Sequence, residues 1–589
     1  MATTWKGKAT NETGNANSGA ALGATTLYGF AGNDTLTTLT TLASGTTTNV
    51  AYGGDGHDTI NGTAVADRLF GGNGNDSLIG GGGKDMENGG TGNDTITAGA
   101  GNALLYGDFG NDSITSGVGN NTVYGGQGND TIVGGTSATV AASAKDILKG
   151  DAGNDSITAA AYSGAASVYS NTLFGGLGND TLTSSAFTAG TTVKDVLVGG
   201  QGADSLVGGT SNAVNTFASY YDSTWSVNVN LTTGVGAAGA TGATSSLSTN
   251  STAAGDTLTN VGNVTGSIYK DTLTGNTGAN ILNGGAGNDT IDSGTANAGN
   301  DQLLGGAGND SIIMRDATQT GDVVNGGDGV DTMDFSNATT GVTVNLSSLI
   351  GSTAFNFQGG GGSGTIIDVE NVIGSGFADT LTAVGGGMVN GGAGNDNILT
   401  ASVVGAADTL IGGAGNDTYD LSGNFQRDYI SITATSGTVA NGDDTIKGFD
   451  QGQGDRVYIK LADFGATVAA TATGVAGTAI TIAGTGNNAY YTANYGASVV
   501  AGTSTTHNLA SITVASDAVV SGSGAVVANA AHAQFLYDDA TGILKFDSDG
   551  TGVAVAITVG HFDLTQMTAT VVGNSAAHAL ESADFLFIA

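Results

Sequence analysis

The chain of 589 residues contains no cysteine and no proline, and it carries little positive charge. The absence of cysteine excludes disulfides and a cysteine nucleophile. Lysine and arginine together number 14 against 51 acidic residues, so the net charge is −37. Acidity along the whole length argues against nucleic acid as a partner.

Aromatic residues and long apolar runs are also scarce. Aromatic residues make up 6% of the chain and charged residues 11%, and much of the 39% hydrophobic content is alanine and valine. A thick conventional core is therefore disfavoured, and stability must come partly from another source. No stretch is long and apolar enough to span a bilayer. The first residues lack the apolar segment of a cleavable signal peptide.

Motifs of common catalytic sites are missing as well. The chain has no HExxH, no GxSxG and no phosphate-binding Walker loop. Its histidines are scattered, at His57, His507, His532, His561 and His578. Repeats begin by residue 29, which leaves no room for a catalytic domain in front of them. We therefore expect a protein that is not an enzyme, and the remaining enzymatic alternative is an unrecognised site in the C-terminal region.

Glycine, in contrast, is abundant and regularly spaced. The chain has 104 glycines, and from Gly71 onward the pattern GGxGxD plus three strand-forming residues recurs every nine residues. Successive blocks begin at Gly71, Gly80, Gly89, Ala98, Gly107, Ser116 and Gly125. A fixed short period with glycine at fixed offsets is typical of a solenoid, and two nonapeptides make one coil of turn, strand, turn, strand.

The chemistry of the repeat favours a hard cation. Adjacent glycines allow positive φ angles and expose carbonyl oxygens at the turn, and the aspartate adds a carboxylate. Ligands that are all oxygen suit Ca²⁺ better than zinc or copper. The three residues after the aspartate alternate outward, inward and outward, with Leu or Ile usually in the middle, as in a short strand with one buried face.

The good turns fall on one edge of the solenoid. Their aspartates are 18 residues apart in the most regular part and up to 25 apart where residues are inserted. The candidate calcium ligands on this first edge are Asp34, Asp58, Asp76, Asp94, Asp112, Asp130, Asp155, Asp180, Asp204, Asp289, Asp310, Asp331, Asp396 and Asp417. The associated turn glycines are Gly71, Gly74, Gly89, Gly92, Gly125, Gly128, Gly284, Gly287, Gly305, Gly308, Gly391, Gly394, Gly412 and Gly415.

The opposite, second edge keeps the register but has lost most of its glycines. It carries Asn49, Asp67, Asp85, Ala103, Asn121, Asp146, Asn171, Asp195, Asn280, Asp301, Asp322 and Asp408. Extra residues enter just before these positions, as in 136–145 and 184–194. Only Asp85 follows a full GGxGxD, so it is the one candidate ligand on this edge. The pattern predicts one edge that binds calcium and another that is a row of loops.

The nonapeptides resemble those of the RTX (repeats-in-toxin) family of proteins exported by type I secretion. The resemblance implies an all-β parallel β-roll, with calcium ions held between a turn and the turn one coil later. It also implies export, because the tail LESADFLFIA resembles the uncleaved C-terminal secretion signal of such proteins. The segments 443–459 and 533–550 resemble the β-rich region that caps the roll in this family.

The repeats suggest five segments. Residues 1–28 form an N-terminal cap or first coil, 29–210 a first roll, and 211–270 an inserted coil. Residues 271–420 form a second roll with an insertion at 334–378, and 421–589 a C-terminal β-rich domain that ends in the secretion signal. The two insertions are similar, since each has a V-x-V-N-L strand followed by a glycine- and serine-rich loop and an N-V-x-G-S motif.

These features suggest a function that depends on calcium. Repulsion among the carboxylates and the ordering entropy of glycine should keep the metal-free chain largely disordered. The chain is most similar to RTX-type surface-layer proteins, so we expect a secreted structural protein that assembles with itself at the bacterial surface. The expected partners are further copies, the type I secretion machinery and a cell-surface polysaccharide. The alternatives are a calcium-dependent adhesin or biofilm-matrix protein, and the enzyme considered above.

Overall fold

The structure is a computed structural model of the chain. It describes residues 3–15, 25–38, 48–135, 145–159, 168–185, 192–209, 215–232, 243–244, 255–294, 299–315, 320–346, 353–357, 363–401, 406–422, 427–432, 444–447, 455–460, 518–521, 534–538, 543–547, 557–562 and 585–588. The inserted segment 136–144, most of the predicted loops at 232–254 and 347–363, and most of the predicted capping domain lie outside these residues.

The described residues are all β, as the repeat predicts. They form short strands and no α-helix, and none of their elements is a helix that could cross a membrane. The chain divides into two compact units, Met1–Asp310 and Ser311–Ala589, which are described separately.

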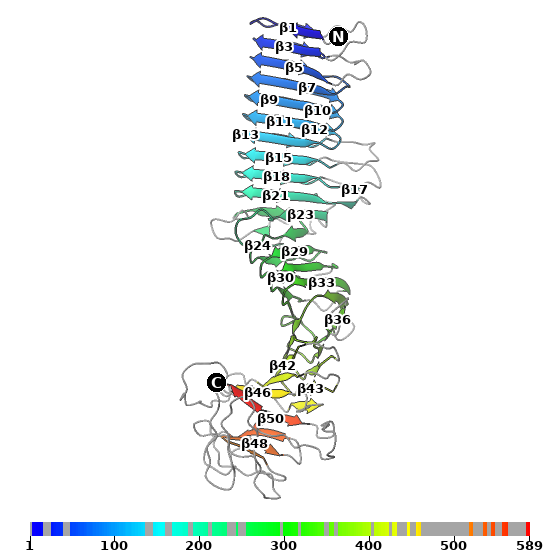
Figure 1. Cartoon of the computed structure of the whole chain (residues 1–589), viewed down its shortest axis with the longest axis vertical. Coiled ribbons are helices and arrows are strands. Elements are labelled where there is room, and N and C mark those ends of the chain that lie inside the picture. The colour runs from blue at the N-terminus through cyan, green and yellow to red at the C-terminus, as the bar shows by residue number, and fades with distance from the viewer. Residues whose placement is uncertain are drawn as a thin grey trace. The chain divides into compact units, whose positions relative to one another are not determined.

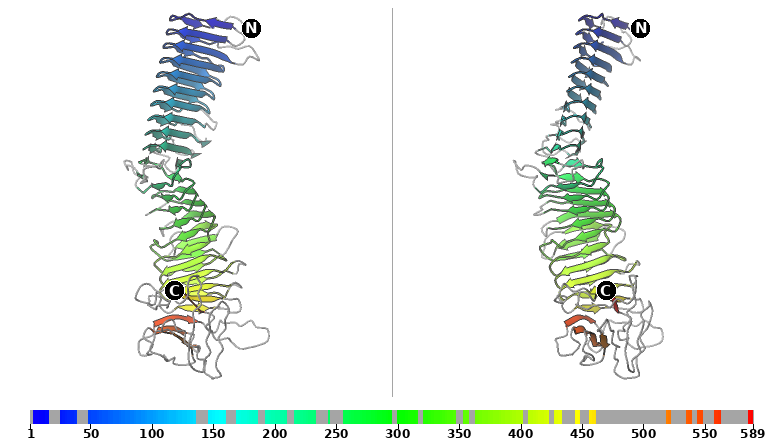
Figure 2. Two further views of the ribbon diagram at one scale, coloured as in Figure 1. Left: turned by 60° about the vertical axis from the view of Figure 1, so that its left-hand side comes forward. Right: turned by 90° about the vertical axis from the view of Figure 1, so that its left-hand side faces the viewer.

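The first unit is a parallel solenoid with two main sheets, whose strands stack coil upon coil (Figures 1 and 2). The first sheet contains β1 (Thr3–Lys6), β3 (Thr25–Ala31), β5 (Asn49–Asp55), β7 (Asp67–Asn73), β9 (Met86–Thr91), β11 (Leu104–Phe109), β13 (Thr122–Gln127), β15 (Ile147–Ala152), β18 (Thr172–Leu177), β21 (Asp195–Gln201), β23 (Thr216–Ser219), β27 (Asn263–Thr265), β29 (Ile281–Ala286) and β31 (Gln302–Ala307).

The second sheet contains β2 (Thr13–Asn15), β4 (Thr35–Thr37), β6 (Thr59–Asn61), β8 (Ser77–Gly82), β10 (Thr95–Ala100), β12 (Ser113–Val118), β14 (Thr131–Val133), β16 (Ser156–Thr158), β19 (Thr181–Thr183), β22 (Ser205–Val207) and β26 (Thr257–Thr259), with β25 (Ala243–Thr244) antiparallel to β26. A third sheet begins with β24 (Asn228–Asn230), β28 (Thr272–Thr274) and β30 (Thr290–Asp292), and β17 (Val168–Tyr169) pairs with β20 (Thr192–Val193).

The core of this solenoid is one buried side chain per strand. Leu69 of β7 and Leu78 of β8 are fully buried, and each is in register with a buried residue one coil away. The aliphatic members of the two rows are Leu27, Ala51, Leu69, Leu105, Val123, Leu148, Leu173 and Leu197, and Leu36, Ile60, Leu78, Ile96, Ile114, Ile132, Ile157, Leu182 and Leu206. The central Leu or Ile of the nonapeptide therefore points inward, as its alternation predicts.

The outer face of the first sheet carries aromatic stacks. The rings of Tyr28 and Tyr52 are 5.1 Å apart and those of Tyr52 and Phe70 are 4.9 Å apart, both nearly parallel. Farther along the same row, the rings of Tyr106 and Tyr124 are 5.1 Å apart. The Lys149 ammonium lies 5.0 Å from the Tyr124 ring centroid and so extends the row by a cation–π contact.

The second unit repeats the architecture, with two antiparallel segments among its described residues, within 342–367 and 534–562. One sheet contains β33 (Thr320–Asp328), β37 (Ser363–Ile367), β36 (Thr353–Phe357), β35 (Val342–Asn345), β39 (Thr380–Thr382), β41 (Asn397–Leu399), β43 (Thr418–Asp420), β45 (Thr445–Lys447), β50 (Ile557–Phe562), β49 (Ile543–Asp547), β48 (Gln534–Asp538) and β47 (Ala518–Ser521). The other contains β32 (Ser311–Ile313), β34 (Thr332–Asp334), β38 (Asn371–Ile373), β40 (Met388–Ala393), β42 (Thr409–Ala414), β44 (Tyr429–Ile432), β46 (Arg456–Lys460) and β51 (Phe585–Ile588).

The two V-x-V-N-L copies occupy equivalent places. The first copy forms β24, which pairs in parallel with β28, and the second forms β35, which pairs in parallel with β39. Both partner strands have the sequence Thr-Leu-Thr and directly follow an aspartate, Asp271 or Asp379. The internal duplication seen in the sequence is therefore a duplicated structural unit.

Candidate metal centres

The first-edge turns are shaped by two kinds of glycine. Gly74 has a φ of +128°, which side chains with a Cβ rarely adopt. Gly71 needs no special φ, but a Cβ there would collide with the carboxylate of Asp76. The predicted glycines Gly92, Gly128, Gly287, Gly308, Gly394 and Gly415 belong to the first kind, and Gly89, Gly125, Gly284, Gly391 and Gly412 belong to the second. Gly305 places its carbonyl oxygen beside Gly284.

The first-edge aspartates form a ladder of hydrogen bonds from coil to coil. The backbone N–H of Asp58 donates to Asp76 Oδ1 at 2.7 Å, and that of Asp76 donates to Asp94 Oδ1 at 2.7 Å. The same bond links the successive aspartates from Asp34 to Asp204, and also the pairs Asp289–Asp310 and Asp396–Asp417. The predicted spacing is therefore the register of the solenoid. One carboxylate oxygen of each acceptor is used by the fold itself.

The other carboxylate oxygen has no such partner. Oδ2 is buried without a hydrogen bond in Asp34, Asp58, Asp76, Asp94, Asp112, Asp130, Asp155, Asp180, Asp204, Asp289, Asp396 and Asp417. A buried carboxylate oxygen without a donor is costly unless a proton or a cation neutralises it. Oδ2 lacks a hydrogen-bond partner at one turn after another along the first edge, so this feature follows from the repeat itself and not from a local irregularity.

Oxygen atoms of two coils converge at most of these turns. Beside Gly71, Asp76 Oδ2 and the carbonyl oxygen of Gly89 both lie close to the position that a Cβ would take, the latter at 2.5 Å. The same pairing of Oδ2 with a carbonyl oxygen from the next coil occurs beside Gly29, Gly53, Gly107, Gly125, Gly150, Gly175, Gly284 and Gly391. Carboxylate and carbonyl oxygens are the ligands that Ca²⁺ prefers. The residues present therefore fit calcium.

Burial raises the pKa of these carboxyl groups. It raises the pKa of Asp76 to about 6 and that of Asp94 to about 7, against hydrogen bonds from the backbone that lower it. Burial likewise raises the pKa of Asp130, Asp180, Asp204, Asp289 and Asp396 to about 7, and that of Asp112, Asp155 and Asp417 to about 6. Near neutral pH the charged form is therefore unfavourable without a neutralising cation.

The second edge has a ladder too, but its carboxylates are satisfied by the protein. The N–H of Asn121 donates to Asp146 Oδ1 at 2.9 Å, and Asp146 Oδ2 accepts a hydrogen bond from the Ser116 hydroxyl at 3.3 Å. Asp195 Oδ2 accepts from the Ser184 hydroxyl at 2.7 Å and from the Ser185 hydroxyl and N–H at 3.0 Å. Serine donors thus satisfy the Oδ2 atoms of Asp146 and Asp195 without a cation.

Asp85 and Glu87 are the exception on the second edge. Burial raises the pKa of Asp85 to about 7. Glu87 is fully buried in the core row, and burial together with the charges of Asp85 and Asp67 raises its pKa to about 8. Sequence reasoning selected Asp85 and missed Glu87, although a glutamate at a position otherwise filled by Leu, Val or Ala was a visible signal.

The structure adds four aspartates to the predicted first-edge set. Asp204 N–H donates to Asp256 Oδ1 at 2.8 Å, and Asp417 N–H donates to Asp444 Oδ1 at 2.9 Å. Asp271 and Asp379 accept in the same way from Val227 and Val342 at 2.7 Å. None of the four follows a GGxGxD motif, but each begins a D-T-[LI] strand, which is the signal that would have found them.

The inserted coils satisfy their aspartates with serine. Ser375 donates its N–H to Asp379 Oδ2 at 2.6 Å and its hydroxyl to Asp379 Oδ1 at 2.8 Å. Ser267 makes the same two bonds to Asp271, the hydroxyl one at 2.9 Å. The serine of the N-V-x-G-S motif therefore donates hydrogen bonds to both carboxylate oxygens, which at the other turns would be neutralised by a cation. The predicted ligand Asp331 differs again, since its N–H donates to Glu370 Oε2 at 2.8 Å.

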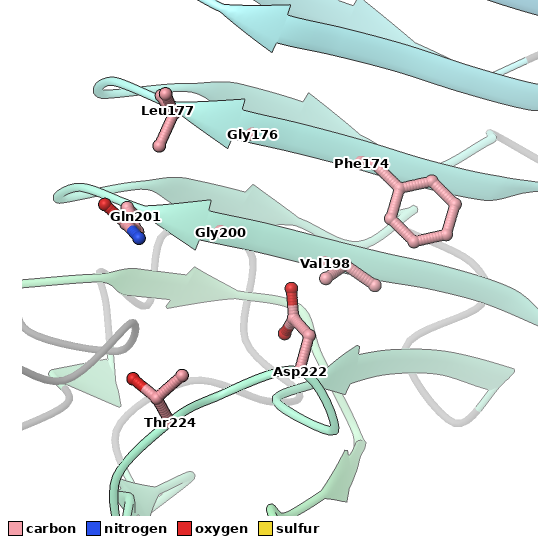
Figure 3. A pocket seen from close by; sticks show the side chains of 8 residues that line it. All are labelled: Phe174, Gly176, Leu177, Val198, Gly200, Gln201, Asp222 and Thr224. Atoms are coloured by element: carbon pink, nitrogen blue, oxygen red, sulfur yellow. The ribbon is translucent and has the colours of Figure 1, made fainter.

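The described residues show neither a metal site built from side chains alone nor a pocket equipped for acid–base catalysis. They contain no group of three or more His, Asp or Glu side chains that could hold a metal without carbonyl ligands. A shallow pocket of about 260 Å³ lies beside β18 and β21, and its lining includes Phe174, Val198, Asp222 and Thr224 (Figure 3). Asp222 is the one titratable group among the described residues that line it, so the pocket offers no pair of acid and base.

Comparison with known proteins identifies the repeat. The model of the RTX calcium-binding nonapeptide repeat (4 copies) matches residues 23–39, 52–87, 88–114, 106–138, 141–161, 166–186, 190–212, 265–297, 291–313 and 405–424. These segments cover less than half of the chain and contain most of the ladder aspartates. The protein therefore carries RTX calcium-binding repeats, which are typical of secreted proteins.

Similarity to whole proteins is slight. No curated protein matches the chain. Among solved structures, the extracellular lipase LipA from Serratia marcescens is 18% identical, with a TM-score of 0.12, over 31% of this chain and 32% of the lipase. The chain thus spans about a third of that relative's length, and a likeness this low says nothing about activity.

Proposed function

We propose that this protein is a calcium-dependent structural protein that folds outside the cell and assembles with copies of itself as a bacterial surface layer. The observation that carries the proposal is the row of buried, unpartnered Oδ2 atoms along the first edge of an otherwise regular solenoid. Such a row stabilises the fold only where a cation is present in quantity, which is the condition outside a cell.

The contribution of calcium is large enough for this role. Extracellular calcium modules bind with dissociation constants of about 0.1–1 mM. At a calcium concentration of about 10 mM, one such site stabilises the folded state by roughly 1.4–2.7 kcal/mol. Summed over the ladder, this is comparable to the cost of ordering a glycine-rich chain. In a cytosol low in calcium the same carboxylates oppose folding, so the chain stays competent for export by the type I machinery.

The two outer faces support lateral contacts between copies. The second sheet presents an outward row of short hydroxyl side chains, at Thr35, Thr59, Ser77, Thr95, Ser113, Thr131, Ser156 and Thr181. The first sheet presents aromatic and aliphatic side chains, of which Tyr52 is 38% and Ile147 is 40% exposed. Flat faces of this kind favour packing against a second copy or a cell-surface polysaccharide.

The proposal assigns no catalytic role. The described residues offer buried carboxylates that face carbonyl oxygens, an arrangement suited to holding cations. The single carboxylate in the pocket beside β18 lacks a partner for acid–base chemistry.

Electron microscopy tests the proposal directly. The full-length protein is purified in chelator, returned to millimolar calcium and examined by negative stain, with I147S as a variant that alters the outer face alone. Ordered sheets or tubes that dissolve on chelation are expected, with weaker order for I147S. Folded single particles that never associate would overturn the assembly role and favour a calcium-dependent adhesin or matrix protein.

A further inference from the structure

Glu87 occupies a core position that the neighbouring coils fill with aliphatic side chains. It lies on β9 in register with Leu69 of β7 and Leu105 of β11. Its side chain is fully buried, and neither Oε1 nor Oε2 has a hydrogen-bond partner. An isolated buried carboxylate costs several kcal/mol, so something must neutralise it.

The Glu87 carboxylate is aimed at a turn on the second edge. Glu87 Oε1 and Asp85 Oδ2 both lie within 2.9 Å of the position that a Cβ would occupy on Gly80. The three atoms nearest to that position all belong to Asp85 and Glu87. The carboxylates of Asp85, just before β9, and of Glu87, on β9, therefore meet at a glycine that leaves room for them.

The turn at Gly80 resembles the first-edge turns, except that a glutamate oxygen replaces the carbonyl oxygen from the next coil. Beside Gly71, Asp76 Oδ2 meets the carbonyl oxygen of Gly89 from the next coil. Beside Gly80, Asp85 Oδ2 meets Glu87 Oε1 instead. The next coil on this edge has Ala98 where a turn begins with glycine and Ala103 where it ends with aspartate or asparagine. Ala103 has no side-chain oxygen, so Glu87 supplies a carboxylate that this coil lacks.

We propose that Asp85 and Glu87 together bind a calcium ion at the second edge, inside the solenoid wall. The nonapeptide motif places an apolar residue at the Glu87 position, so the site lies outside the repeat's own ligand pattern. Two carboxylates are strong ligands for a hard divalent cation, and carbonyl oxygens of the turn can complete its shell. The proposal requires calcium binding but does not depend on self-assembly.

The competing account is a protonated Glu87 that binds no metal. The two accounts differ for E87Q, because glutamine mimics a protonated glutamate in size and charge but lacks the negative charge that makes a carboxylate a strong calcium ligand. They also differ for E87L, which restores the aliphatic residue of the adjacent coils and should fold well. A matched control is L148Q, which places a buried amide in the same row on β15, where the register partners are Val123 and Leu173 and not Glu87.

Counting bound ions decides between them. The full-length wild type and the variants are saturated with calcium, freed of excess ion by gel filtration, and measured for calcium per chain by elemental analysis and native mass spectrometry. We expect E87Q and E87L each to bind one ion fewer than the wild type, and L148Q to bind the wild-type number.

An E87L protein that retains every ion would overturn the proposal and establish Glu87 as a protonated core residue. If E87Q fails to fold, the E87L count decides alone. D76N serves as the reference for the loss of a first-edge ion. A wild type that binds no calcium would overturn this site and the proposed function together, whereas a missing lattice with a reduced E87L count would overturn the assembly role alone.

Discussion

Replacing Asp76 with asparagine should have opposite effects on stability with and without calcium. Asparagine keeps an Oδ1 acceptor for the Asp58 N–H but replaces the unpartnered Oδ2 with an amide group. In calcium the substitution removes one site, so the free energy of unfolding should fall by roughly 1.4–2.7 kcal/mol at about 10 mM calcium.

In chelator the effect of D76N on the free energy of unfolding has the opposite sign. The folded carboxyl group has a pKa of about 6 against an ordinary value of 3.8, because burial disfavours its charge. A raised pKa in an acid means that the charged form destabilises the fold, and this cost grows from about pH 4 and is complete above about pH 7. The neutral amide avoids that cost, so D76N should be more stable than the wild type by on the order of 2 kcal/mol at pH 7.5.

Urea unfolding followed by circular dichroism measures the first effect, and the β signal that remains in chelator measures the second. The matched control is D146N on the second edge, where Asp146 accepts its hydrogen bonds from Asn121 and Ser116. Its effect should not depend on calcium. The reasoning fails if D76N loses no stability in calcium, or if D76N and D146N respond to calcium alike.

Three further outcomes follow from the structure. Protons and calcium neutralise the same ladder carboxyl groups, whose folded pKa of about 6 to 7 exceeds the ordinary 3.8, so the calcium midpoint for folding should fall from pH 7.5 to 5.5 in a circular dichroism titration, and a midpoint that rises would contradict the assignment. Asp151 has a φ of +74° where its register neighbour Gly176 is a glycine, so D151G should raise the free energy of unfolding by about 1 kcal/mol, and D155G, which removes a ladder ligand, should lower it. Tyr52 stacks on both Tyr28 and Phe70, so Y52A should lower stability by about 1–3 kcal/mol with or without calcium, and a loss seen in one condition alone would show that the stack is coupled to the metal edge.

Much of the fold could be predicted from the sequence because the nonapeptide encodes it locally. The 18-residue separation of Asp58 and Asp76 is both the length of one coil and the hydrogen-bond register, and Leu69 and Leu78 are buried as their alternation predicts. The all-β class and the different character of the two edges follow from the same local rules.

The rest of the site could not be predicted from the sequence, because it depends on contacts that a local sequence pattern does not encode. Asp195 Oδ2 is satisfied by Ser184 and Ser185, which precede it by 11 and 10 residues, and spacing does not reveal such a partner. Asp271 and Asp379 belong to the ladder although their turns keep only the first glycine of the motif, Gly266 or Gly374, because the backbone needs an acceptor there whether or not a metal is bound. The predictions of self-assembly, of partners and of the absence of catalysis remain predictions.

The aspartate ladder has a direction, and this gives the solenoid a rule for insertion. Every bond runs from a backbone N–H to the side chain of a later coil, so the earlier residue can be of almost any type while the later one must offer an oxygen. The two inserted coils obey this rule, since each opens with a valine, Val227 or Val342, and each is followed by an aspartate that accepts its N–H. New coils can therefore be spliced in wherever the chain resumes with an acceptor, which allows such a protein to lengthen by whole modules while every existing coil keeps its register.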